Sequence, residues 1–300
     1  MAVYDCCPFF NENDIFEIRL NQHWDFVDKF IVVEAGETHT GIKKPLNFDH
    51  ERFKPYADKI IYRSFDSFEE TIKQFPEYYD ELNAKLLDYK PEWIRDSYQA
   101  NYIFKVLKDI GAQDSDLVLL SPPDEIVKKS AFEQAAKIFS ETDQVFDVID
   151  RSGRVSITGT RPIVHFCMKM YIYKFNLLSV DNVPQPMLTE FGNHKKIFPN
   201  LARNVGIHTH PHIDYAGWHF SYADNTDGEK VLTKMKSWPH ATDPGKGLNG
   251  GRRMDITTPI EAIQILVNEF NLRIESIGPD THPEYILNNL EKFKDYIFEE

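Results

Sequence analysis

The chain has 300 residues, of which 42% are hydrophobic and 13% aromatic, so it can bury a substantial globular core. Its formal net charge of −13 argues against a nucleic-acid partner, because phosphate backbones attract clustered Lys and Arg. No apolar run approaches the roughly 20 residues of a membrane-spanning helix, and the N-terminus lacks the pattern of a signal peptide. With three cysteines, two of them adjacent, the chain has no disulfide framework. We therefore expect no membrane insertion and a cytoplasmic location.

The first sixty residues alternate strand and helix signals. Residues 3–7 form a short apolar run, and Asn11, with Asp14 three positions later, predicts the N-cap of a helix. Residues 30–33 and 60–62 are two further compact apolar runs of the kind that buried strands show. Short strands separated by helices predict an α/β fold with a mostly parallel, doubly wound sheet.

Residues 93–111 give the clearest helix signal, because apolar side chains recur every four residues and Gly111 is a natural stop. The apolar run 117–120 follows and predicts a central strand. The sequence SPPDEI comes at its carboxyl end. Ligands of open α/β sheets bind outside the carboxyl ends of strands, so we expect chemistry at this turn.

The second half of the chain is less regular. Residues 164–173 alternate strictly and predict a half-buried strand, and residues 217–221 predict another. The glycine-rich stretch 241–255 has the composition of a mobile loop. We expect three further helices, at about 228–238, 259–270 and 283–298.

No linker is long enough to require a domain boundary. We therefore expect one domain over residues 1–300, which divides into a first half over residues 1–127, a second half over residues 128–256 and C-terminal helices over residues 257–300.

Asp124 and Glu125 stand at the carboxyl end of the predicted central strand. Acidic residues there could hold a divalent cation that neutralises charge on a leaving phosphate. An ordinary helix start, with acids favoured by the helix dipole, explains the same pattern.

Two other polar residues have both a functional and a structural explanation. Glu34 ends an apolar strand and could hydrogen-bond a ribose or base, or it could be a solvated strand end. Arg95, close to Gln99 and Asn101, could pair with phosphate or stack on a base. A surface arginine on an amphipathic helix is the commoner explanation.

His208, His210 and His212 are spaced by two and would share one face of a strand, where they could ligate a transition metal. The chain would then be a metal-dependent hydrolase. Pro211 interrupts the run and makes a regular strand unfavourable, so the pattern favours a polar loop.

The segment GWHFSYADNTDGEKVLTKMKSWPH holds the last acidic cluster. Asp224, Asp227 and Glu229 gather at a predicted helix start, and His240 follows the end of that helix. One aspartate could serve as general base towards an acceptor hydroxyl, and His240 could be a further metal ligand. Helix-terminal acids and a loop histidine are the structural explanation.

Several segments in series resemble glycosyltransferase family 17, whose best-known member adds the bisecting, β-1,4-linked N-acetylglucosamine of N-glycans. The similar blocks occur in the expected order over about residues 4–240, which makes the resemblance far more specific than one motif. They read YDCCPFFNENDIFEIRL, VVEAGETHTGIKKPLNF, RDSYQANYIF, LVLLSPPDEI, GWHFS and KMKSWPH.

The resemblance implies a GT-A-like α/β/α sandwich and an inverting transfer of N-acetylglucosamine from a UDP-sugar donor to a glycan acceptor, usually with a divalent cation such as manganese (Mn²⁺). By matched motif, it implies that the donor site includes Asn11, Glu12, Asp14, Glu34, Thr38, Thr40, Arg95 and Asn101. Asp124, Glu125 and His240 match metal-site positions, and we assign the general base to Asp224 or Asp227.

One departure from the family pattern concerns the metal. The family usually has an aspartate two positions before the residue that matches Asp124, and here Pro122 stands in its place. A prolyl ring cannot ligate a cation, so the site has lost one expected carboxylate. A non-catalytic nucleotide- or glycan-binding module is therefore a further alternative. The animal enzymes of the family are membrane-anchored, whereas this chain starts close to the catalytic domain, which is the pattern of a cytoplasmic relative.

Overall fold

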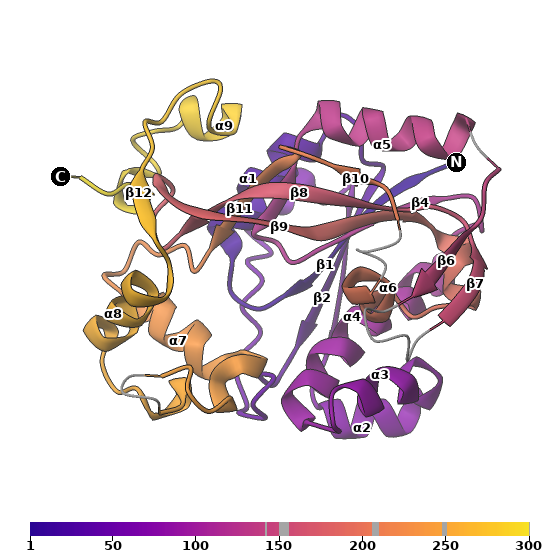
Figure 1. Ribbon diagram of the computed structural model, residues 1–300, viewed down its shortest axis with the longest axis horizontal. Helices are drawn as coiled ribbons and strands as arrows, with labels where there is room; N and C mark the ends of the chain where they lie inside the picture. Colours follow the sequence, from indigo (N-terminus) through magenta and orange to yellow (C-terminus); the bar gives the residue numbers. More distant parts are fainter. Residues whose placement is uncertain (142, 150–155, 206–209, 248–250, 300) are drawn as a thin grey trace.

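The computed structural model describes residues 1–141, 143–149, 156–205, 210–247 and 251–299 (Figure 1). Its α-helices are α1 (Asn13–His23), α2 (Phe68–Gln74), α3 (Glu81–Leu86), α4 (Pro91–Asp109), α5 (Lys129–Glu141), α6 (Pro199–Val205), α7 (Glu229–Ser237), α8 (Pro259–Glu269) and α9 (Glu284–Leu287). Its strands are β1 (Val3–Phe9), β2 (Lys29–Ala35), β3 (Ile60–Phe65), β4 (Leu117–Leu120), β5 (Glu125–Val127), β6 (Phe146–Ile149), β7 (Ser156–Thr160), β8 (Ile163–Ile172), β9 (Leu177–Glu190), β10 (His212–Ile213), β11 (Gly217–Ser221) and β12 (Leu272–Ile274).

One large sheet organises the molecule, with the strand order β3-β2-β1-β4-β9-β8-β11-β5. The strands β3, β2, β1 and β4 run parallel, and β11 and β10 run parallel to β8. The long strand β9 is antiparallel to both β4 and β8, and β5 is antiparallel to β11. The α/β fold predicted from the sequence is therefore confirmed, and the architecture is GT-A-like.

Helices cover both faces of the sheet, because strands such as β1 send alternate side chains to opposite sides. Tyr4 and Cys6 pack with α4 and its neighbours, whereas Cys7 and Phe9 pack on the side of α1. Figure 1 shows α5 above the sheet and α2, α3, α4 and α6 below it. A core on each face explains why the central strands are apolar throughout.

Helix α4 forms where the sequence predicts it. Pro91 occupies its first turn, the apolar stripe around Ile103 and Leu107 is buried, and Gly111 follows its end with φ +81°. This left-handed backbone is one that glycine adopts without steric cost. The helix packs on β1 and β2, so its first turns lie over the carboxyl ends of these strands.

The strand order reverses between β1 and β4. From β1 the chain moves outward through β2 to β3, and it then returns to place β4 on the other side of β1. Where the connections that follow two adjacent parallel strands run in opposite directions, a crevice opens at the carboxyl ends of these strands, and this place is called the switch point. This point lies between residues 9–13 and residues 121–125, and it positions the site described below.

Three local expectations need correction. Strand β8 is buried on both faces except at Lys169, because helices pack against both sides: Phe166 packs with α5, and Ile172 packs with α7 and α8. Glu12 rather than Asn11 is the N-cap of α1, and no side chain caps that helix. The last predicted helix, at 283–298, is broken into the four-residue α9 and a 3-10 turn at Lys294–Tyr296.

The predicted loop at 241–255 contains ordered ends. Residues Pro239–Thr242 and Arg253–Asp255 form 3-10 turns, and Arg253 is buried against Tyr222 and Glu269. Within the described ranges, every helix is too short or too polar to cross a lipid bilayer.

Candidate active site

A cleft of about 480 Å³ lies at the carboxyl ends of β1 and β4. This volume falls within the range of small-molecule sites, which is roughly 300–1,000 Å³. One wall comes from the segment after β2 and the first turns of α4, and the other comes from β11, α7 and the end of α8. Its main polar and aromatic lining residues are Glu12, Glu37, Thr38, His39, Trp93, Asp96, Gln99, Asp124, Glu125, Arg203, His219, Tyr222, Lys234, His240, Lys246 and Arg253.

The turn at residues 121–125 brings two carboxylates to the cleft. Ser121 N donates to the carbonyl oxygen of Cys6 at 3.2 Å, which continues the pairing of β4 with β1 for one more residue. Glu125 N then donates to Pro122 O at 3.2 Å, and Phe220 N donates to Asp124 O at 2.8 Å. The turn is thus tied to β1 on one side and to β11 on the other.

A buried ionic cluster under the turn fixes its position. Arg19, on α1, is fully buried and pairs with Asp5, and its Nη1 donates to Pro122 O at 2.6 Å and to Glu125 O at 2.9 Å. His23 Nδ1 lies 2.7 Å from Asp5 Oδ2. Burial would raise the pKa of the Asp5 carboxyl, but Arg19 and His23 outweigh it and hold that pKa at about 2. The charges of Asp5 and Arg19 therefore persist at neutral pH and anchor the turn to α1.

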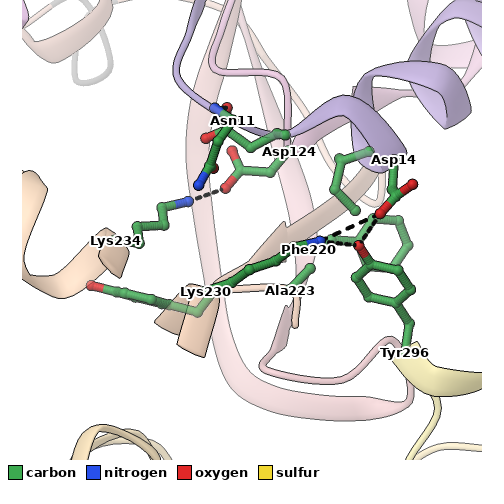
Figure 2. Close-up of a pocket in the computed structure, with 11 residues that line it drawn as sticks. Asn11, Asp14, Asp124, Phe220, Ala223, Lys230, Lys234 and Tyr296 are labelled. Atoms are coloured by element: carbon green, nitrogen blue, oxygen red, sulfur yellow. Dashed lines mark hydrogen bonds and ion pairs between the residues drawn. The ribbon is translucent and has the colours of Figure 1, made fainter. Parts of the chain in front are cut away.

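Asp124 makes an ion pair with a lysine from a distant part of the sequence. Its Oδ2 lies 2.7 Å from Lys234 Nζ, on α7 (Figure 2). The same oxygen lies 3.8 Å from His219 Nε2, on β11. Burial would raise the pKa of Asp124, but the Lys234 ammonium and His219 hold that pKa well below its usual range. Burial would lower the pKa of Lys234, yet Asp124 and Glu12 raise it above its ordinary value. Both groups are therefore charged across the physiological range.

Glu125 is in a different electrostatic state. Its Oε1 lies 2.7 Å from Arg203 Nη2, whereas its Oε2 is buried and has no hydrogen-bond partner among the described residues. Burial raises the pKa of this carboxyl above its usual value, although Arg203 acts in the opposite direction. Two adjacent acids thus have pKa values displaced in opposite directions, which is common at catalytic sites.

A small cavity of about 30 Å³ adjoins the cleft behind Asp124 and is lined by Asn11, Glu12 and Asp14 as well. In Figure 2, Asp14 lies beside Lys230 and Tyr296. Lys230 Nζ donates to Tyr296 Oη at 2.9 Å, and Asp14 also pairs with Arg52 at 2.8 Å. This network joins α1 to α7 and to the C-terminal segment.

The structure brings some of the predicted donor residues to the cleft. Glu12 and Thr38 line it, and Asn11 and Asp14 line the adjoining cavity. The hydroxyl oxygen of Thr40 lies 2.8 Å from that of Thr38, and the Thr40 hydroxyl donates to Lys236 O at 3.0 Å. Thr40 therefore bridges the two walls of the cleft.

The other three predicted donor residues have internal partners and do not line the cleft. Both oxygens of the buried Glu34 accept hydrogen bonds, one from Asn47 N at 2.6 Å and one from Tyr62 Oη at 3.0 Å. Arg95 Nη1 donates to His39 O at 2.9 Å. Asn101, fully buried, donates to Tyr78 O at 3.2 Å and accepts from Asn200 N at 3.3 Å.

The two aspartates predicted as bases also lie outside the cleft. Asp224 is fully buried, and its oxygens accept from Thr226 Oγ1 at 2.9 Å and from Val231 N at 3.0 Å, which stabilises the start of α7. Asp227 is exposed in the turn before that helix, with φ +50°. Asp224 therefore has a structural role at the start of α7, and Asp227 has one in the turn before it.

The predicted metal ligands do not come together as a group. No cluster of three or more His, Cys, Asp or Glu side chains is placed to hold a metal ion, as far as the described ranges extend. His240 lines the cleft but its Nδ1 lies 2.6 Å from Asp243, and its ring packs edge-on against Trp93 and Trp238.

The histidine pattern at 208–212 differs from the expected polar loop. His208 lies outside the described residues. His210 is buried, and its Nδ1 accepts from Ile163 N at 3.0 Å. His212 is exposed and begins strand β10, which pairs with β8. A metal-dependent hydrolase is therefore not favoured.

Sequence reasoning did not single out Lys234, Arg203 or His219 as site residues. A signal for Lys234 existed: it lies three residues after the buried Val231 and next to the buried Met235, on the apolar stripe of α7. A lysine on such a stripe has a charged or ligand partner by default, because its isolated burial is costly. Nothing local marks Arg203, whose proximity to Glu125 depends on tertiary structure.

The chain matches the glycosyltransferase family 17 sequence profile over residues 1–246. No curated protein matches it. A solved structure described as a crystal structure of a mycobacterial protein shares 11% identity, with 94% of this chain and 86% of that chain covered. The TM-score of that comparison is 0.36, so the likeness carries no argument on fold or function. The cleft lies at the switch point between β1 and β4, and two acids at the carboxyl end of β4 line it, as expected for a fold that binds a ligand there. The family match covers most of the chain, and the protein therefore belongs to glycosyltransferase family 17.

Proposed function

We propose that this protein is an inverting glycosyltransferase that moves N-acetylglucosamine, or a related hexose, from a UDP-sugar to a hydroxyl group of a glycan. The observation that carries the proposal is the cleft at the β1–β4 switch point, whose floor is the turn bearing Asp124 and Glu125. A glycosyltransferase of this family needs room for a donor and an acceptor, and the cleft has walls suited to both.

The nucleoside part of the donor is assigned to the wall formed by α4 and the segment after β2. Thr38, Asp96 and Gln99 offer polar groups there, and Trp93 offers an aromatic surface. Gln99 Nε2 donates to Val33 O at 2.9 Å and its Oε1 lies 2.9 Å from His39 Nε2, so these side chains are held before a ligand arrives. The diphosphate would then extend towards Asp124 and Lys234.

We assign the role of general base to Glu125 rather than to Asp224 or Asp227. In the transfer, an acceptor oxygen forms a bond to the anomeric carbon while the bond from that carbon to the phosphate oxygen breaks and UDP leaves. The hydroxyl proton passes to the base. Glu125 lines the cleft, has one oxygen fixed by Arg203 and has a raised pKa, which are properties of a carboxylate base.

The divalent cation expected from the family remains a prediction, and the side chains at Asp124 do not form a fitting site for it. Asp124 is already paired with Lys234, Glu125 is paired with Arg203, and Pro122 offers no ligand. A cation such as manganese is held by several oxygen ligands, often carboxylates. The paired acids of this turn therefore do not fit such a cation.

A thermal-shift panel tests the proposed function, with UDP-sugars and UDP added in separate samples. We expect UDP-N-acetylglucosamine, or a related UDP-hexose, to raise the melting temperature, because a ligand that binds only the folded state stabilises it. Release of UDP on adding glycan acceptors would then identify transfer. Absence of stabilisation by every UDP-sugar contradicts the proposal, and binding without transfer or donor hydrolysis would identify a non-catalytic module.

A further inference from the structure

We propose that the ammonium group of Lys234 neutralises the diphosphate of the donor, in place of a divalent cation, so that donor binding does not require metal. This inference rests on the proposed function, because it concerns how the same cleft holds a nucleoside diphosphate. It goes further by assigning the charge that the diphosphate needs to a residue of this chain.

The first support is the position of Lys234. Its Nζ lies 2.7 Å from Asp124 Oδ2, at the end of the cleft where the strand β4 turns. An ammonium group has three N–H donors, and Asp124 accepts from one of them. The side chain lines the cleft, so the remaining donors are available to phosphate oxygens.

The second support is the charge balance of the turn. Both acids of the turn already have basic partners, Lys234 for Asp124 and Arg203 for Glu125. A divalent cation binds where carboxylates are left uncompensated, and its approach to this turn would meet the charge of Lys234. With each carboxylate compensated, the turn repels an anionic diphosphate less than an unpaired acidic pair would.

The third support is the rigidity of the lysine. Helix α7 is held at its start by Asp224, which accepts from Val231 N at 3.0 Å, and its inner face is buried through Val231 and Met235. The carboxylate of Asp124 then fixes the end of the Lys234 side chain. A cation that is positioned before the ligand binds loses little freedom on binding, so it can contribute to affinity.

The test measures UDP affinity by isothermal titration calorimetry, first in EDTA and then with manganese added. For the wild-type protein we expect the two dissociation constants to agree within about twofold, since the charge comes from the protein. Lys234→Met, which keeps an unbranched side chain one atom shorter but removes its charge, should weaken UDP binding in EDTA by about tenfold or more. Lys234→Arg should recover most of that affinity.

Lys236→Met is the matched control, because Lys236 lies on the same helix but does not line the cleft. It should leave UDP affinity unchanged within about twofold. Melting temperatures of the variants show whether each one folds, and Lys234→Gln, a second substitution that removes the charge, keeps the test decisive if Lys234→Met does not fold, because it should also weaken UDP binding in EDTA by about tenfold or more.

The outcomes separate the inference from the proposed function. If wild-type protein binds UDP about tenfold or more tightly with manganese than in EDTA, the transferase proposal stands and the role of Lys234 is wrong. Unchanged UDP affinity in Lys234→Met also overturns it. If the wild-type protein binds UDP under neither condition, the proposed donor is wrong and the inference falls with it.

Discussion

Glu125 has two carboxylate oxygens in different environments, and this asymmetry makes a specific kinetic prediction. Oε1 pairs with Arg203, and Oε2 has no partner within the described part of the chain. Glu125→Gln keeps the shape and can still contact Arg203 through its amide oxygen, but it cannot accept a proton. We expect kcat to fall by about 100-fold or more, the usual contribution of a general base.

Asp227→Asn is the matched control for this measurement, because Asp227 is an exposed acid in the turn before α7. We expect it to keep kcat within about twofold of the wild type. The reverse result, with turnover lost in Asp227→Asn and kept in Glu125→Gln, would show that Asp227, one of the two bases expected from the sequence, is the general base.

The raised pKa of Glu125 also predicts how activity depends on pH. A base acts in its deprotonated form, so activity is lost as pH falls through the pKa of that group in the folded protein. Burial raises this pKa above that of an ordinary glutamate, so the acid limb of the kcat profile should lie above the usual carboxyl range near 4.3. A limb at or below that value, measured with a donor whose own ionisation is constant, would argue against Glu125.

At the scale of elements, β11 approaches β5 so closely that one position has no room for a side chain. A Cβ atom at Gly217 would lie 2.0 Å from Ile126 O. Gly217→Ala must therefore displace β5. This strand comes next in the chain after the turn that carries Asp124 and Glu125. We expect a loss of about 1–3 kcal/mol in the free energy of unfolding, with weaker donor binding, measured by chemical denaturation and calorimetry.

Gly245→Ala provides a comparison, since nothing lies within 4 Å of a Cβ atom at that position, although its φ of +78° adds backbone strain. It should leave donor affinity within about twofold of the wild type, because it does not touch the turn. Equal effects of the two substitutions on donor affinity would show that the close approach of β11 to β5 does not hold the turn.

The sequence predicts those elements whose local pattern agrees with their tertiary surroundings. Helix α4 and strand β4 appear where apolar periodicity and Gly111 indicate them, and the turn at the carboxyl end of β4, where we expect chemistry, lines the cleft. Strand β8 differs because alternation shows which residues share a face, not whether a second layer covers the other face. The C-terminal stretch at 283–298 has helical character, but its ends are held by contacts with Glu17 and Asn176, and the helix breaks.

For the residues of the candidate site too, the sequence predicts what a local pattern indicates and misses what depends on tertiary contacts. Asp124 and Glu125 could be found because they follow a predicted strand, whereas Glu12 and Thr38 are implied only by the resemblance to the family. Asn101 and Asp224 occur in polar segments that look equally functional, and only the structure shows that backbone groups elsewhere satisfy them. Lys234 and Arg203 reach the cleft from helices distant in sequence, so no local pattern links them to Asp124 and Glu125.

At the scale of the whole molecule, buried neutral histidines make the fold sensitive to acid. Burial lowers the pKa of His210 to about 4 and that of His194 to about 3. The same groups have a pKa near 6.5 in the unfolded chain, which therefore binds more protons between these values. Stability is fully present above about pH 6.5 and falls as the pH decreases, by up to about 1.4 kcal/mol per pH unit for each group.

His210→Gln isolates one part of this effect. His210 Nδ1 accepts from Ile163 N at 3.0 Å, and protonation would turn this acceptor into a donor. Gln has an amide oxygen that can replace the acceptor but does not titrate, so the melting temperature should fall less steeply below pH 6.5 than in the wild type. The exposed His50, changed to Gln, is the control and should retain the wild-type slope. Parallel slopes in wild type and His210→Gln would contradict the assignment.

The pairing of Asp124 with Lys234 joins residues 110 positions apart, and this separation has a consequence for biosynthesis. A ribosome makes the chain from its N-terminus, so the strands β1 to β4 and both acids of the turn emerge well before α7 does. Until α7 follows, Asp124 and the crevice beside it lack the lysine that the finished protein places there. A nascent chain that ends before α7 therefore lacks the ammonium partner of Asp124, and donor binding on our proposal becomes possible only after α7 has been made.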